Sequence, residues 1–263
     1  MDNQKVNEHV RRYNSYMGNF NVNYNFLINP WIPTMWSFIF PGFGHILLGM
    51  FIEGYLLIIW EVIVNTNAHL NEAMLYSFTG KFELAKKVLN IKWALLYIAV
   101  YVFAAWDSYR SSCDTNKLYI LAEKENATIV PYKLSASSIV YLEKYEPRNS
   151  IIWSILMPGL GQFLIHRIPT GFFILAWWLV LCYFSNLPLA TYYTMIGSFS
   201  KVFSVLRPQW FLYMPSLYMF SMYDSYFFSV ELNKLFKLEQ AQFFRKEFQN
   251  AQFKLPWKNR KWY

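Results

Sequence analysis

The sequence predicts an all-α integral membrane protein built by tandem duplication. Hydrophobic residues make up 55% of the 263 positions and charged residues only 15%, whereas roughly a quarter of the residues in soluble domains are charged. A shift of 117 positions places Pro41-Gly42-Phe43-Gly44 on Pro158-Gly159-Leu160-Gly161, and Asp107-Ser108-Tyr109 on Asp224-Ser225-Tyr226, without a gap. A repeat of this length indicates two copies of one module.

The first 30 residues form a polar segment rich in asparagine and tyrosine. They hold no apolar run followed by a small-residue cleavage site, so we expect no signal peptide and a cytoplasmic N-terminal segment. Residues 31–126 are expected to form the first membrane module.

Each module is expected to contain one half-helix and two membrane spans. The half-helices, Thr34–Phe40 and Ile151–Met157, are too short to cross ~30 Å of hydrocarbon and end where proline and glycine interrupt the helix. The four spans are long enough to cross as helices. They are Ile46–Val64 and Trp93–Tyr109 in the first module, and Ile168–Phe184 and Trp210–Phe228 in the second.

The remaining segments are expected in the cytoplasm. A linker, residues 127–147, joins the first module to the second, which covers residues 148–228. In the tail, residues 229–263, apolar positions of Val230–Phe253 recur at helical spacing among basic residues. This pattern predicts an amphipathic helix on the anionic inner leaflet. A helix packed on a partner or on the linker is the alternative.

The distribution of basic residues favours this topology. With two spans per module, 18 of the 24 lysines and arginines lie on the side of the N-terminus. Three spans per module would invert the second copy and reduce that number to 16. Because basic residues accumulate on the cytoplasmic side, we expect four spans, parallel modules and both termini in the cytoplasm.

The strongest local signal is the Pro-Gly-x-Gly turn after each half-helix. Such a break can expose backbone groups to an ion or a lipid headgroup. It can also let the half-helix fold against the following span, and we favour this structural interpretation. The candidate residues are Pro41, Gly42, Gly44, Pro158, Gly159 and Gly161.

Asp107 and Asp224 are acidic residues that occupy equivalent places in both copies, at the cytoplasmic ends of spans. A carboxylate in a membrane segment is a functional candidate because its burial is costly. A structural role is the favoured interpretation, in which each aspartate accepts hydrogen bonds from the neighbouring turn and ties the pieces of one module together.

At three positions a titratable residue of the first copy aligns with an uncharged residue of another type in the second. They are His45, Glu53 and Glu61, which align with Gln162, Thr170 and Trp178. A specialised ligand site or proton route is one interpretation, and interhelical hydrogen bonding is the other. On one continuous helix, a spacing of eight residues puts more than two turns between neighbours, so we expect no shared metal ion.

The segment from Ser154 to Phe163, Ser-x-x-x-Pro-Gly-Leu-Gly-Gln-Phe, resembles small bacterial multi-pass membrane proteins with a Pro-Gly-Leu-Gly-Gln turn. The order of a glycine-led span from Gly171 and a span ending at Asp224 is distantly similar to the two-transmembrane-helix domain family. The first copy departs from the turn motif at Phe43 and His45. The resemblance implies an inner-membrane protein and supplies no catalytic residue.

We therefore expect a non-enzymatic scaffold or accessory subunit of the bacterial cytoplasmic membrane, without cofactors. Its expected partners are membrane lipids and another membrane protein or a second copy of itself. Because the basic residues are dispersed along membrane-flanking segments, nucleic acid is not an expected partner. The alternative is a small oligomeric permease or channel with a pathway between the repeats.

Overall fold

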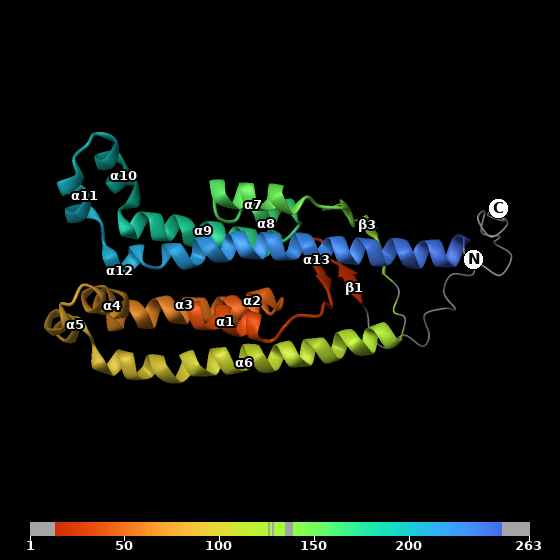
Figure 1. Ribbon diagram of the computed structural model, residues 1–263, viewed down its shortest axis with the longest axis horizontal. Coiled ribbons are helices and arrows are strands. Elements are labelled where there is room, and N and C mark those ends of the chain that lie inside the picture. The colour runs from red at the N-terminus through yellow and green to blue at the C-terminus, as the bar shows by residue number, and fades with distance from the viewer. Residues whose placement is uncertain (1–13, 126, 128, 135–138, 249–263) are drawn as a thin grey trace, which may run out of the picture.

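The computed structural model describes residues 14–125, 127, 129–134 and 139–248. It is mostly helical and elongated, with the two halves of the chain lying side by side along the long axis (Figure 1). Strand β1 and the last turn of helix α13 lie toward the same end of the molecule, whereas the short helices α4, α5, α10 and α11 lie at the other end.

The elements of the first half are β1 (Ser15–Met17), β2 (Val22–Tyr24), α1 (Trp31–Ile39), α2 (Phe43–Leu47), α3 (Phe51–Ala68), α4 (Leu70–Phe78), α5 (Phe82–Val88) and α6 (Ile91–Lys124). Those of the second half are β3 (Tyr132–Leu134), β4 (Ile139–Tyr141), α7 (Pro147–Leu156), α8 (Leu160–Leu164), α9 (Ile168–Ser185), α10 (Leu187–Met195), α11 (Phe199–Val205), α12 (Pro208–Phe211) and α13 (Met214–Phe248).

The two halves contain the same elements in the same order. Both strands and helices α2 to α5 have counterparts whose bounds lie 117 residues further along the chain. The one difference in element order among the described residues is that α6 is continuous, whereas its counterpart is divided into α12 and α13. Pro215 explains the division, because its ring lacks an N–H and clashes with the preceding helical turn.

Two short antiparallel hairpins were not predicted. β1 pairs with β2, and β3 pairs with β4, each over three residues. They lie in the segments expected to be a polar N-terminus and a linker, for which no strands were predicted. The β1–β2 hairpin packs on the second half of the chain, where the Ile168 amide donates to the Phe20 carbonyl at 3.0 Å.

The first predicted span also begins in the wrong place. The helix expected from Ile46 is divided into α2 and α3, because Gly49 adopts a left-handed conformation (φ +80°) between them. Glycine takes this conformation without the steric cost that a side chain brings. The division turns α2 away from α3, so His45 of α2 and Glu53 of α3 do not lie on one continuous helix.

The C-terminal amphipathic segment does not form a separate helix. Up to Phe248, the last residue described there, it continues the last predicted span as one 35-residue helix, α13. At 1.5 Å per residue this helix is about 52 Å long, so it extends about 20 Å beyond a ~30 Å hydrocarbon layer. The helix expected from Val230 is therefore present as far as Phe248, as part of a longer helix, and its place on the membrane surface stays a prediction.

Helices α6 and α9 are those described helices that are long and apolar enough to cross a membrane. They contain the predicted spans Trp93–Tyr109 and Ile168–Phe184. The other two predicted spans begin in the short helices α2 and α12 and continue in α3 and α13, which carry more polar residues, including Glu53, Glu61 and Asp224.

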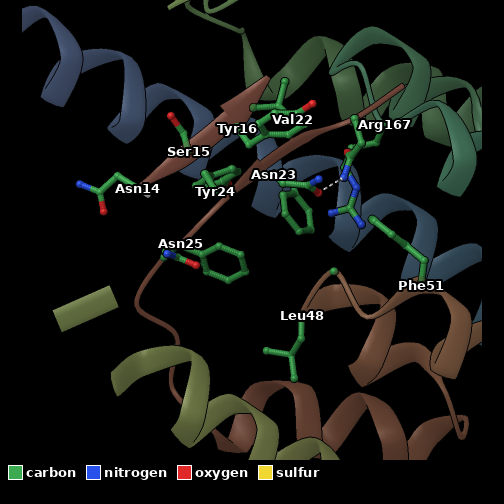
Figure 2. A pocket seen from close by; sticks show the side chains of 14 residues that line it. Asn14, Ser15, Tyr16, Val22, Asn23, Tyr24, Asn25, Leu48, Phe51 and Arg167 are labelled. Carbon is green, nitrogen blue, oxygen red and sulfur yellow. Dashed lines mark hydrogen bonds between the residues drawn. The ribbon is translucent and has the colours of Figure 1, made fainter. Parts of the chain in front are cut away.

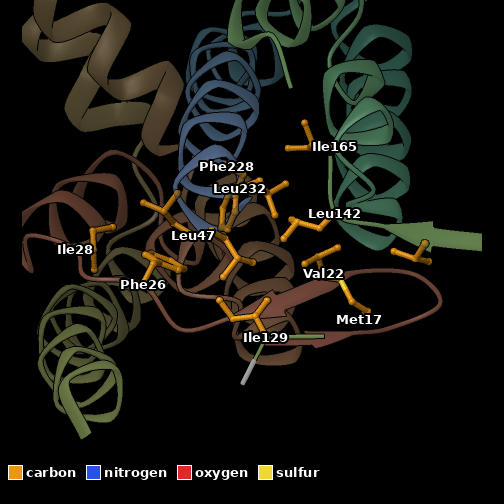
Figure 3. Close-up of a cluster of buried hydrophobic side chains, with 12 residues drawn as sticks. Met17, Val22, Phe26, Ile28, Leu47, Ile129, Leu142, Ile165, Phe228 and Leu232 are labelled. Atoms are coloured by element: carbon orange, nitrogen blue, oxygen red, sulfur yellow. The ribbon is translucent and has the colours of Figure 1, made fainter. Parts of the chain in front are cut away.

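Two buried apolar clusters join the halves. The first packs the β1–β2 hairpin and the residues after it against the middle of α13 and the linker, as Figure 3 shows for Val22, Phe26 and Phe228. The second is rich in aromatic rings and places Phe40, Phe43 and Ile58 of the first half against Leu217 and Phe220 of the second. Both halves thus contribute to each core.

Candidate functional site

The Pro-Gly-x-Gly turns bring each half-helix against the following long helix. Gly42 and Gly159 have left-handed backbones, with φ of +101° and +103°. A Cβ atom on Gly42 would lie 2.4 Å from the Gly54 carbonyl oxygen, and one on Gly159 would lie 2.6 Å from that of Gly171. Only glycine satisfies both the conformation and the close approach.

The second glycine of each turn contacts the half-helix itself. A Cβ on Gly44 would lie 2.2 Å from the Pro33 carbonyl oxygen, and one on Gly161 would lie 2.3 Å from that of Ser150. Each turn is therefore enclosed by backbone on both sides. The four turn glycines among the predicted candidates therefore contribute to packing.

Asp107 lies beside the turn of the first copy. Its Oδ2 is 3.2 Å from His45 Nε2, and its Oδ1 accepts hydrogen bonds from Arg110 Nη2 at 2.6 Å and Nε at 3.1 Å. Asp107 and His45 are buried, whereas the Arg110 side chain is 57% exposed. Asp107 thus connects α6 to α2, the short helix that follows the turn.

Glu53 joins this cluster, contrary to the argument from spacing along one helix. Because α2 and α3 are separate helices, one ligand atom each of His45, Glu53 and Asp107 can lie within 4.8 Å of one another. Glu53 is exposed and the other two are buried. The three form the one group of described histidine, cysteine, aspartate and glutamate residues that could hold a metal ion.

Asp224, the counterpart of Asp107, is compensated in a different way. It accepts a hydrogen bond from Gln162 Nε2 at 3.1 Å, and its Oδ1 is 3.2 Å from Arg167 Nη1. Both members of this ion pair are buried, with side chains 3% (Arg167) and 0% (Asp224) exposed. The Arg167 guanidinium also lies 3.4 Å from the centre of the Phe228 ring.

Sequence reasoning missed the role of Arg167. It precedes α9 and aligns with Met50 in the first copy, so the second copy also holds a charged group that its counterpart lacks. Desolvation lowers the pKa of the Arg167 guanidinium, and the neighbouring Asp224 raises it. A guanidinium stays protonated in proteins, so Arg167 places a buried positive charge beside Asp224.

Arg167 also lines a pocket of about 450 Å³ between the β1–β2 hairpin and the start of α3 (Figure 2). Asparagine side chains of the hairpin segment, including Asn23 and Asn25, line the same pocket, and Phe51 lies on the opposite wall. Burial raises the pKa of the Tyr24 phenol there well above its usual range, and the negative charge of Glu231 adds to this effect. Tyr24 is therefore a neutral wall of the pocket.

Glu61 lies in a second polar cluster, further along α3. Eight residues of helix separate it from Glu53, or about 12 Å along the axis. Its Oε1 accepts hydrogen bonds from Asn65 at 3.0 Å and Tyr97 at 3.3 Å. Gln209 of the second half donates to the side-chain oxygen of Asn65 at 3.0 Å, so the cluster crosses the boundary between the halves.

Aromatic and apolar side chains occupy the region between these polar clusters. The rings of Phe43 and Phe220 stack with centres 4.2 Å apart, and Phe40 stacks on Phe43 at 4.7 Å. A void lined by Phe40, Phe43, Ile58 and their neighbours measures about 10 Å³. This volume is at the lower limit for one water molecule.

Comparison of the chain with protein-family models, with curated proteins and with solved structures finds no match in any of the three.

Proposed function

We propose that the chain is a non-enzymatic scaffold or accessory subunit of a bacterial cytoplasmic membrane, built as a tandem duplication. Its four spans are α3, α6, α9 and α13, in two parallel modules of two spans each. Support comes from the shared order of elements at an offset of 117 residues and from the apolar length of α6 and α9. The excess of basic residues on the side of the N-terminus supports cytoplasmic termini under the positive-inside rule.

The observation that carries the proposal is the aromatic contact between the halves. The stacked rings of Phe40, Phe43 and Phe220 separate the polar cluster of Glu53 from that of Glu61. A solute path between the repeats needs a continuous polar or hydrated lining. A packed boundary instead favours a rigid body that presents its outer surface to lipids and partners.

The end of α13 is the partner surface in this proposal. Phe243, Phe244 and Phe248 are exposed there and form a cluster of ring contacts beside the basic residues Arg245 and Lys246. Exposed aromatic and basic side chains suit both an anionic lipid surface and a partner protein. Since this part of α13 projects about 20 Å past the hydrocarbon, another membrane protein or a second copy of the chain is the favoured partner.

A small oligomeric permease or channel is the second candidate. The buried cluster of Glu61, Asn65 and Gln209 favours it, because buried polar groups at membrane depth commonly mark transport pathways. Such a pathway would have to open through the stacked rings of Phe43 and Phe220, and it would require an oligomer.

Flux measurements distinguish the two candidates. Purified protein in sealed liposomes is expected to add no proton, sodium or potassium flux to that of empty liposomes, since the rings block the path. A protein-dependent flux that disappears in Glu61→Gln would support the permease and contradict the scaffold.

Cross-linking tests the partner surface at the end of α13. A photoreactive side chain at position 244, in native membranes, is expected to form a discrete cross-linked protein species. The same group at Leu84 in α5 is the control, and equal cross-linking from both would contradict a specific partner surface.

The topology predicts opposite labelling of two exposed lysines. In a variant with Cys113 and Cys182 changed to serine, Lys124→Cys at the end of α6 is expected to react with a membrane-impermeant maleimide only after the cells are opened. Lys87→Cys in α5 is expected to react in intact cells. Three spans per module would exchange these two results, because α5 would lie in the cytoplasm and the end of α6 outside. Lys234→Cys in α13 lies in the cytoplasm under both topologies and is the control for labelling after the cells are opened. Labelling of positions 87 and 124 from one side would contradict four spans.

A further inference from the structure

The cluster of His45, Glu53 and Asp107 has no equivalent in the second module. There, Gln162 Nε2 donates to Asp224 Oδ2 at 3.1 Å, much as His45 Nε2 faces Asp107 Oδ2 at 3.2 Å. A glutamine thus suffices for the contact between the short helix and the aspartate. A histidine is not needed for this contact, so the imidazole of His45 requires another explanation.

The charges around the two aspartates also differ. In the second module the buried cation Arg167 lies 3.2 Å from Asp224, and the residue aligned with Glu53 is the uncharged Thr170. In the first module Met50 replaces the arginine, and Glu53 adds a second carboxylate near Asp107. Compared with the second module, the first therefore lacks the buried cation and has two additional groups, His45 and Glu53, that can ligate cations.

We propose that His45, Glu53 and Asp107 bind a divalent transition-metal ion, of the class of Zn²⁺, at the cytoplasmic end of the first module. One imidazole and two carboxylates are ligands that such ions accept. The bound ion supplies the positive charge beside Asp107 that the Arg167 guanidinium supplies beside Asp224.

The distances fit this role. Tetrahedral coordination at 2.0–2.2 Å places neighbouring ligand atoms roughly 3.4 Å apart, and His45 Nε2 and Asp107 Oδ2 are 3.2 Å apart. The three donor atoms lie within 4.8 Å of one another. Glu53 is exposed, so its side chain is free to adjust and complete the ligand set.

Arg110 holds Asp107 in a suitable orientation. Its Nη2 and Nε both donate to Oδ1, at 2.6 and 3.1 Å, and leave Oδ2 directed at the imidazole. Hydrogen bonds from outside the ligand set commonly orient metal-binding carboxylates in this way. With three protein ligands, the fourth position of the ion is open to water or to a partner's side chain.

The test measures binding of Zn²⁺ by full-length protein that is purified in mild detergent without a histidine tag and stripped with a chelator. One ion per chain is expected by elemental analysis. Binding also raises the melting temperature with increasing Zn²⁺, because the ion stabilises the folded state. His45→Gln, which installs the residue of the second module, is expected to weaken binding at least tenfold while the protein keeps its melting temperature in the absence of metal.

Glu53→Gln provides a second variant at an exposed position, where folding is not at risk, and is also expected to weaken binding at least tenfold. His69→Gln and His166→Gln are the matched controls and should bind as the unchanged protein does. Absence of Zn²⁺ binding in the unchanged protein would overturn the proposal. So would binding by His45→Gln and Glu53→Gln that is as tight as binding by the unchanged protein, since this would place the ion elsewhere.

Discussion

Arg167→Met is expected to lower the free energy of unfolding by about 3–5 kcal/mol, because it leaves the carboxylate of Asp224 buried without its charged partner. Methionine has a similar length and stands at the aligned position 50 of the first module, so its volume is tolerated in this fold. The quantity to measure is the free energy of unfolding in mixed detergent micelles, from a denaturing-detergent titration followed by near-ultraviolet circular dichroism.

Arg110→Met is the matched control for this substitution. Arg110 pairs with Asp107 as Arg167 pairs with Asp224, but its side chain is 57% exposed against 3% for Arg167. An exposed ion pair contributes about 0–1 kcal/mol, so this variant should unfold close to the unchanged protein. The double variant Arg167→Met with Asp224→Asn should recover part of the loss. Equal destabilisation by the two single arginine variants would show that burial of the pair is not decisive.

Gly42→Ala is expected to destabilise the protein by about 2–5 kcal/mol. The left-handed conformation costs an alanine about 1–2 kcal/mol, and the overlap with the Gly54 carbonyl oxygen at 2.4 Å adds the cost of overpacking, about 1–3 kcal/mol. Gly159→Ala should behave in the same way, because its Cβ would lie 2.6 Å from the Gly171 oxygen.

The control for the glycine variants is Gly80→Ala, in the turn between α4 and α5. Gly80 is also left-handed (φ +75°), but a Cβ there would have nothing within 4 Å. Only the conformational cost, about 1–2 kcal/mol, is expected. The same denaturation titration gives the difference between the two variants, and a difference near zero would mean that the turn relaxes away from α3.

Local patterns account for much of what the sequence predicted. Each half-helix ends before its Pro-Gly-x-Gly turn, α1 at Ile39 and α7 at Leu156, because proline removes a backbone donor and glycine permits the left-handed turn. The long apolar runs likewise predicted helices that are present as α6 and α9. Four membrane spans and the tandem duplication remain proposals.

Other features depend on contacts that a pattern of residues does not reveal. The strands β1 to β4 are three residues long and lie in polar segments, so alternation gives no usable signal. The convergence of His45 and Glu53 depends on the left-handed Gly49, and an isolated glycine within an apolar run does not by itself reveal its backbone conformation. The alignment of the two copies contains a signal for Arg167, because it aligns with the uncharged Met50, close to other positions at which the copies differ.

The β1–β2 hairpin also bears on the order in which the protein assembles. Phe26, which follows the hairpin, packs against Phe227 and Phe228, with ring centres 5.5 and 5.7 Å apart. About 200 residues of synthesis separate these partners, or roughly 10–40 s at 5–20 residues per second. The earliest-made segment of the described chain therefore cannot dock on α13 until synthesis has passed Phe228, and this contact between the two halves forms late in biogenesis.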